Sequence, residues 1–139
     1  RVINMTRRIL VLSLLVLASP LLHANYPPTL PEYNGEQLFQ RFCASCHGRL
    51  GLGNGPVAPA ISVPVPDLIL LFERAGGSFP IERVLEVIDG RAVLPAHGTR
   101  VMPVWGYELE AQIPPDQPGR EVAQDLIDRL VDYLRSIQQ

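Results

Sequence analysis

Apolar residues recur at helical spacing toward the end of the chain. From about Glu121 to Gln138 they lie three and four residues apart, and acidic residues occupy positions between them. We therefore expect a long amphipathic helix with one buried face. The residues expected on that face are Leu126, Ile127, Leu130, Tyr133, Leu134 and Ile137.

Three shorter segments also carry helical signals. The first begins near Asn34, a favourable N-cap, and leads directly into a pair of cysteines. The second covers residues 68–74, with Asp67 as its cap and two glycines after its end. The third begins near Pro80, has apolar residues at positions i, i+3, i+4 and i+7, and ends at Gly90.

Proline and glycine dominate the segments between these helices. Residues 25–33 contain three prolines and predict an extended lead-in. Residues 48–56 are too rich in glycine for a packed element, and they lack the preceding strand and the lysine of a phosphate-binding loop. Residues 91–106 predict an irregular stretch, and residues 107–120 predict a long connection to the last helix. No internal repeat is present.

The N-terminal segment has the features of a secretory signal. Two arginines precede the almost wholly apolar residues 9–22, and Ala24 offers a small residue for cleavage. We expect residues 1–24 to be a signal peptide, with residues 1–4 upstream of its start, and the mature chain to begin at Asn25. The apolar run is shorter than the roughly 20 residues that span a bilayer, so we expect no stable membrane span after cleavage. Retention as an uncleaved anchor is the alternative.

The length of the chain favours a single domain, and its charge argues against a nucleic-acid-binding protein. The chain has 139 residues, and residues 34–139 suit a single domain. All 12 basic residues are arginine, three of them lie within residues 1–24, and 14 residues are Asp or Glu, so the mature chain has a net charge of −5. Because nucleic-acid binding needs a basic face, we expect protein partners and no nucleic acid.

The segment Cys43-Ala44-Ser45-Cys46-His47 carries the main chemical signal. On a helical turn the two cysteines share a face, so each can form a thioether bond to one haem vinyl group. The adjoining histidine can then bind the iron. A zinc site would need a second pair of ligands, a thioredoxin-like pair would be expected beside a strand-helix-strand unit, and a plain disulfide needs no histidine. The run therefore favours one covalently attached haem c.

The chemistry of such a haem depends on the group that faces His47 across the iron. Met102 is the only methionine after signal cleavage, and Pro103 restricts its backbone. We predict that Met102 is the second axial ligand. His97 is the rival ligand, an open iron site is a further alternative, and a methionine that only fills the core is the plainest one.

Three further side chains near Met102 are candidates for contact with the haem. Arg91 and Arg100 carry guanidinium forks that suit haem propionates, although solvated surface positions fit them equally well. Trp105 is the only tryptophan. Its ring suits the wall of the haem pocket and its N–H a propionate, and filling of the core is the alternative.

Together these features resemble the small bacterial class I cytochromes c, which hold one haem between a histidine and a methionine. The cysteine motif lies near the mature N-terminus, the methionine follows about fifty residues later, and an amphipathic helix ends the chain. The resemblance covers residues 33–138. It implies an all-α fold in which the N- and C-terminal helices cross and two or so shorter helices wrap around the haem. Gly35 and Phe39 match the crossing positions of the first helix, and Leu130 and Tyr133 match those of the last.

The resemblance also implies roles for other residues. The carbonyl of Pro59 would accept a hydrogen bond from the imidazole of His47, and Ile61 would lie beside the haem. Residues 96–106 are similar to a segment of several exported monohaem cytochromes and cytochrome subunits. The lysine ring of the mitochondrial-type members is missing, so docking through a basic patch is not expected.

The expected function is electron transfer in the periplasm rather than catalysis, with one electron carried on the haem. The expected partners are a dehydrogenase, an oxidase or a reductase. Two alternatives remain open from the sequence. One is a dedicated cytochrome subunit of an exported dehydrogenase, and the other is a haem enzyme or gas binder with an open iron site.

Overall fold

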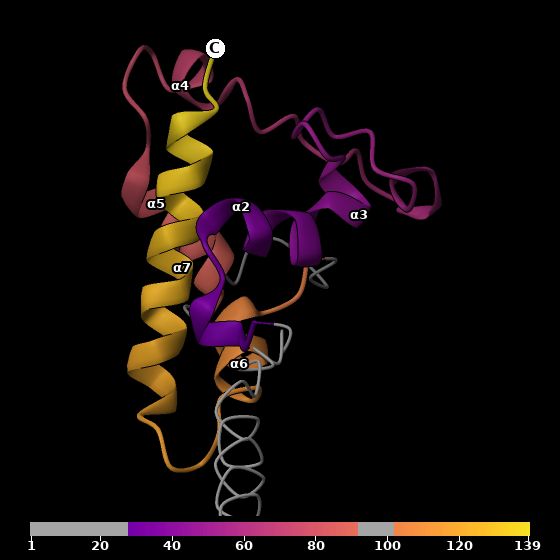
Figure 1. Cartoon of the computed structure of the whole chain (residues 1–139). Coiled ribbons are helices and arrows are strands. Elements are labelled where there is room, and N and C mark those ends of the chain that lie inside the picture. The colour runs from indigo at the N-terminus through magenta and orange to yellow at the C-terminus, as the bar shows by residue number, and fades with distance from the viewer. Residues whose placement is uncertain (1–27, 92–101) are drawn as a thin grey trace, which may run out of the picture.

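The structure is a computed structural model that describes residues 28–91 and 102–139 (Figure 1). These residues form helices and loops without a strand, which confirms the predicted all-α fold. The predicted signal peptide and the first residues of the predicted lead-in lie outside the described residues. In chain order the elements are η1 (Leu30–Glu32), α2 (Gly35–Leu38), η2 (Phe39–Cys43), α3 (Ala44–His47), η3 (Ala58–Ala60), α4 (Leu71–Arg74), α5 (Ile81–Asp89), α6 (Trp105–Glu110) and α7 (Gly119–Ser136).

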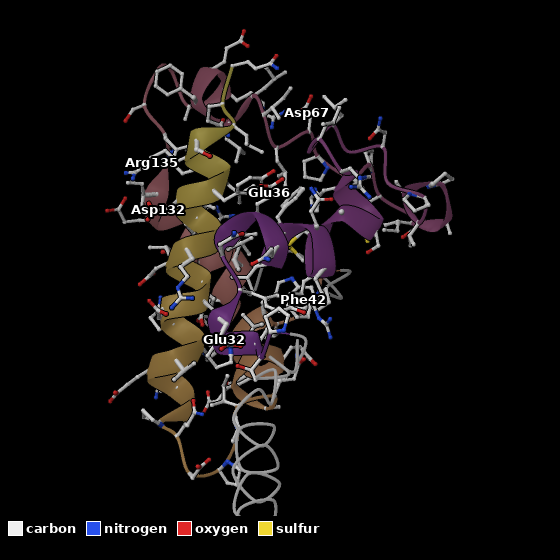
Figure 2. All side chains as sticks on the ribbon, in the orientation of Figure 1. Glu32, Glu36, Phe42, Asp67, Asp132 and Arg135 are labelled. Carbon is white, nitrogen blue, oxygen red and sulfur yellow. The ribbon has the colours of Figure 1, made fainter. Side chains whose placement is uncertain are left out.

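The core forms around α7. Its apolar face packs against α2, α5 and α6, and its charged face points outward, as Asp132 and Arg135 do in Figure 2. Removal of these apolar side chains from water is the dominant stabilising contribution in such a fold. The buried residues of α7 are Ala123, Leu126, Ile127, Leu130, Val131 and Leu134. Tyr133 and Ile137, which were also predicted to be buried, are half-buried.

The first helix crosses the last one at Gly35. A Cβ atom on Gly35 would lie 2.8 Å from the Cβ of Tyr133 and would collide with the carbonyl oxygen of Arg129. Beside this contact the rings of Phe39 and Tyr133 lie 5.4 Å apart between centroids. The predicted crossing is therefore confirmed, and glycine is needed because the two backbones approach so closely.

The predicted N-cap of the first helix and the predicted end of α5 are both confirmed. The side chain of Asn34 accepts a hydrogen bond of 2.9 Å from the backbone N–H of Gln37, and the side chain of Gln37 accepts one of 2.9 Å from the N–H of Asn34. This capping box begins α2. Gly90 ends α5 in the left-handed conformation, with a φ of 67°. The proline-rich lead-in is less extended than expected, because η1 adds one 3-10 turn.

Two helices differ from the sequence expectation. α4 begins only at Leu71, because the carboxylate of Asp67 accepts a hydrogen bond of 2.8 Å from the N–H of Ile69 and holds a turn there instead. α6 was not predicted: it includes the end of the predicted irregular stretch (residues 91–106) and the start of the predicted long connection (residues 107–120). Its half-buried Trp105 and buried Leu109 stand one helical turn apart and face the core. That i, i+4 pair was the signal for this short helix.

The cysteine motif lies on a part of the chain that extends away from α7. α2, η2 and α3 form one continuous helical run, and the segment after it loops outward before the chain returns to α4 (Figure 1). The side chain of Gln138 fixes the segment that leads into α4. It donates a hydrogen bond to the carbonyl of Leu68 and accepts one from the N–H of Phe72, both at 2.9 Å. In the described part of the chain, none of the helices has the length and apolar character needed to span a bilayer.

Candidate haem-binding site

The helical run of residues 35–47, here called the attachment helix, contains one wide turn. The N–H of Ala44 donates to the carbonyl of Phe39, five residues earlier, so Phe39–Cys43 forms a π-helical turn. Such a turn changes the direction of the side chains that follow it relative to a regular α-helix. Because the turn ends at Cys43, it sets the direction in which the first cysteine of the motif points.

The two cysteines are free thiols in different surroundings. Cys43 is buried, with 9% of its surface exposed, and Cys46 is half-buried. Burial, and to a smaller extent the neighbouring Cys46, raises the pKa of Cys43 to about 12. This pKa describes the chain before haem is attached, because attachment converts both thiols to thioethers.

His47 ends the attachment helix in a buried position. Its Nδ1 lies 3.1 Å from the carbonyl oxygen of Pro66. Because a carbonyl can only accept, this contact places the ring proton on Nδ1 and leaves Nε2 free to bind a metal. Burial lowers the pKa of His47, and the hydrogen bond to Pro66 offsets part of that shift. Burial thus favours the neutral form that ligates metals, and the hydrogen bond to Pro66 selects the tautomer of that form.

The acceptor for His47 is a correction to the sequence prediction, which assigned this role to Pro59. Pro59 lies exposed in η3, and the carbonyl that reaches the imidazole belongs to Pro66. Four prolines lie between residues 48 and 66, and their spacing from His47 does not reveal which one the loop returns to the ring. Ile61 is half-buried just after η3, and its predicted place beside the haem stays a prediction.

The glycine-rich segment after His47 caps the attachment helix. The N–H groups of Gly53, Gly55 and Val57 donate to the carbonyls of His47, Cys46 and Ser45 at 2.8, 3.0 and 3.0 Å. The last carbonyls of a helix have no partner within the helix, so this segment satisfies them. The loop thereby holds the cysteine motif from the carbonyl end of the helix.

Two glycines make this close packing possible. A Cβ on Gly55 would lie 2.6 Å from the carbonyl group of Cys46. Gly53 has a φ of +73°, and a Cβ there would lie 3.1 Å from the carbonyl carbon of Pro66 and would collide with the carbonyl oxygen of Val65. The backbone of Gly53 therefore supports the very peptide group that bonds to His47.

Trp105 lies beside the attachment helix, and Met102 precedes it in the chain by three residues. Met102 is half-buried and packs against the core cluster. The ring of Trp105 lies 5.4 Å from that of Phe42 between centroids, and Figure 2 shows Phe42 on the side of the attachment helix toward α6. Phe42 directly precedes Cys43, so the structure brings the methionine segment close to the cysteine motif. Trp105 contributes to the core, and its predicted contact with the haem stays a prediction.

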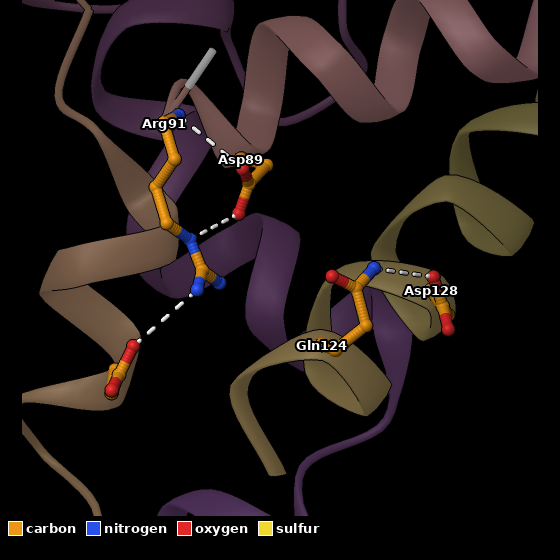
Figure 3. Close-up of polar contacts among 5 residues, drawn as sticks. Asp89, Arg91, Gln124 and Asp128 are labelled. Atoms are coloured by element: carbon orange, nitrogen blue, oxygen red, sulfur yellow. Dashed lines mark hydrogen bonds and ion pairs between the residues drawn. The ribbon is translucent and has the colours of Figure 1, made fainter. Parts of the chain in front are cut away.

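The remaining candidates divide into two groups. Arg100 and the rival ligand His97 lie outside the described residues. Arg91 is neither a surface group nor free for a propionate. It forms ion pairs with Asp89 and Glu110 (Figure 3). No sequence pattern predicts the bridge as a whole, because Glu110 lies 19 residues later in the chain, on another helix.

The donor set at this site fits a covalently attached haem. Two free thiols lie on one helical stretch, and the imidazole beside them has its Nε2 available. Within residues 28–91 and 102–139, no three His, Cys, Asp or Glu side chains are grouped so that they could hold a metal ion. One imidazole and one thioether suit an iron whose other four ligands come from a macrocycle.

Comparison with known proteins gives one match. The family model described as Cytochrome c matches residues 33–138, which include the attachment helix, Met102 and every helix from α2 to α7. No curated protein and no solved structure matches the chain.

Proposed function

Because the chain belongs to the cytochrome c family, we propose that it carries single electrons between redox proteins outside the cytoplasm, with His47 and Met102 as axial ligands of its iron. As elsewhere in the family, the cofactor is a covalently attached haem c. When bound, the haem supplies an iron that gains or loses one electron. The residues of the chain hold, orient and shield it.

One observation carries the proposal. His47 presents Nε2 at the end of the attachment helix while its Nδ1 donates to the carbonyl of Pro66 at 3.1 Å. This hydrogen bond fixes the tautomer and orientation of the ligand and increases its basicity. The cysteines on the preceding turn would hold the macrocycle beside that ring. An electron carrier benefits from such rigid ligation, because little rearrangement accompanies the change of charge.

Met102 is the proposed second ligand. A neutral thioether is softer than imidazole and stabilises ferrous iron, so a His/Met pair supports a higher reduction potential than two histidines. Met102 is half-buried and packs against the core, which shields its side chain in part from water.

Variants at Met102 and His97 test the ligand set. We expect Met102→Ala to admit carbon monoxide and cyanide and to abolish the weak red absorbance band of methionine-ligated ferric haem. Met102→His should keep six-coordinate iron at a lower potential. His97→Ala is the matched variant and should leave both spectrum and potential close to wild type. A five-coordinate spectrum in His97→Ala, with an unaltered spectrum in Met102→Ala, would establish His97 as the ligand instead.

Export to the periplasm is the second part of the proposal. It rests on the charged segment, the apolar segment and the cleavage residue that follow one another up to Ala24. Intact-mass measurement of the holoprotein should give a chain that begins at Asn25. A species that retains residues 9–22, or one found only in membranes, contradicts cleavage.

The proposed partners are redox proteins with a basic or locally complementary docking face. The net charge of −5 expected for the mature chain supports this choice, since unlike charges speed the encounter of two proteins. The association rate with a redox partner should then fall as salt increases. A rate independent of salt would mean that the charge serves solubility alone.

A further inference from the structure

Arg91 lies at the centre of a half-buried group of charges. Its side chain is 12% exposed, and its Nε lies 2.7 Å from Oδ1 of Asp89. Its Nη1 lies 3.4 Å from Oε2 of Glu110, and its backbone N–H donates to Oδ2 of Asp89 at 3.3 Å (Figure 3). One guanidinium therefore joins the last residue of α5 to the last residue of α6. The planar fork of arginine suits a bridge between two carboxylates better than the point charge of lysine.

The first turn of α6 packs directly on this group. A Cβ on Gly106 would lie 2.8 Å from the carbonyl oxygen of Asp89 and would collide with the side chains of Asp89 and Arg91. The ring of Tyr107 lies 5.8 Å from the Cζ of Arg91, a cation–π distance. Arg91 thus contacts both ends of α6, and the helix has no room to move toward α5.

α6 in turn connects Met102 to the attachment helix. It begins at Trp105, three residues after Met102. The ring of Trp105 packs at 5.4 Å on Phe42, which directly precedes Cys43. A shift of α6 away from α5 would therefore move both the backbone that leads from Met102 and the tryptophan that rests on the attachment helix.

We infer that Arg91 is a positioning residue that holds α6, and with it Met102, in place for ligation of the iron. The inference rests on the proposed function, since it takes Met102 as the ligand. Arg91 acts through its ion pairs with Asp89 and Glu110. Its removal should leave the fold and the haem attachment in place but weaken the hold on Met102.

The rate at which cyanide binds the ferric holoprotein measures how readily Met102 dissociates from the iron, because cyanide binds only when the methionine has left. We expect Arg91→Gln to raise that rate about tenfold, in line with the loss of hydrogen bonds to charged partners, and to weaken the red absorbance band. Arg91→Lys keeps the charge without the fork and should fall between Arg91→Gln and wild type. Arg83→Gln is the matched control, because among the described residues Arg83 pairs with Glu86 of its own helix, at 3.5 Å on the exposed surface.

A second variant keeps the inference testable if Arg91→Gln does not fold. Glu110→Gln removes one arm of the bridge and leaves Asp89 to pair with Arg91, so it should fold and raise the cyanide rate to a smaller extent. Rates in Arg91→Gln and Glu110→Gln equal to that of Arg83→Gln overturn the positioning role. If Met102→Ala has altered the spectrum as proposed, such a result rejects Arg91 alone. If Met102→Ala leaves the spectrum unaltered, the ligand assignment fails and the inference fails with it.

Discussion

Gly53, in the loop after the cysteine motif, lets the chain pack closely against the peptide group of Pro66, whose carbonyl bonds to His47. Gly53 adopts a φ of +73°, and its α-carbon faces the backbone of residues 65–67 without room for a side chain. A methyl group there would add both backbone strain and a collision, and the easiest relief is a shift of the Pro66 peptide away from His47.

We therefore expect Gly53→Ala to lower the free energy of unfolding of the holoprotein by about 2 to 4 kcal/mol. It should also raise the reduction potential, because a weaker bond to Nδ1 makes the imidazole a poorer donor to iron. Gly76→Ala is the control. Gly76 has a φ of +77°, but among the described residues a Cβ there would point into open space, so the substitution should cost about 1 to 2 kcal/mol and leave the potential unchanged. Equal potentials in the two variants would show that Gly53 does not position the Pro66 carbonyl.

Tyr133 gives the molecule a dependence on alkaline pH. Burial raises the pKa of this phenol, the nearby Glu36 carboxylate raises it further, and a hydrogen bond with Gln40 offsets part of the shift. The native state thus holds the proton to higher pH than the unfolded state. The contribution is complete below pH 10, the ordinary pKa of tyrosine, and is lost as pH rises above it. Urea unfolding of Tyr133→Phe should show a smaller loss of stability above that pH than wild type, and equal slopes would contradict the shift.

At the level of elements, the crossing of α2 and α7 fixes the base of the attachment helix. The contact leaves no room for a Cβ on Gly35. Because the cysteines lie at the far end of the same helical run, a change at the crossing alters how the whole run rests on the core.

Gly35→Ala should lower the free energy of unfolding by about 1 to 3 kcal/mol through overpacking. Gly119→Ala is the matched helix-start variant. Its Cβ would come no closer than 3.5 Å to any neighbour, so its stability should stay within about 0.5 kcal/mol of wild type. Denaturant unfolding of the two holoproteins, followed by circular dichroism, compares them. A Gly35→Ala protein as stable as Gly119→Ala would mean that the crossing relaxes freely.

For the whole molecule, the arrangement in Figure 1 separates a helical core from the part that carries the haem. α5, α6 and α7 pack together, while α3 and the loop after it extend away from α7. A small domain buries a limited share of its surface, so it depends on its cofactor for further apolar contact.

We expect the double variant Cys43→Ala/Cys46→Ala, which cannot attach haem, to be largely unfolded. The loss of the surface on which Phe42 and Trp105 would pack should exceed the small stability of the chain alone. Far-ultraviolet circular dichroism and thermal melting measure the outcome, with Ser45→Ala as a control that keeps both sulfurs. Full helicity and a sharp cooperative melt in the double variant would contradict this dependence.

The sequence by itself determined those features that depend on near neighbours in the chain. The C-x-x-C-H run, the Asn34 cap, the stop at Gly90 and the apolar stripe of α7 each depend on residues a few positions apart. Local geometry therefore sufficed to predict the start of the attachment helix, α5, α7 and the cysteine motif, whereas the crossing at Gly35 was implied by the family resemblance and α6 was not predicted.

Only the tertiary structure decided which distant groups meet. The bond between His47 and Pro66 spans 19 residues, as does the pairing of Arg91 with Glu110. The first contact depends on the course of the loop after His47, and the second depends on how α5 and α6 pack. Both are stabilised by many contacts between residues far apart in the chain, and no short sequence pattern contains these contacts. For this reason the family resemblance implied Pro59 where the structure has Pro66, and no sequence pattern indicated that Arg91 lies in an ion-paired bridge.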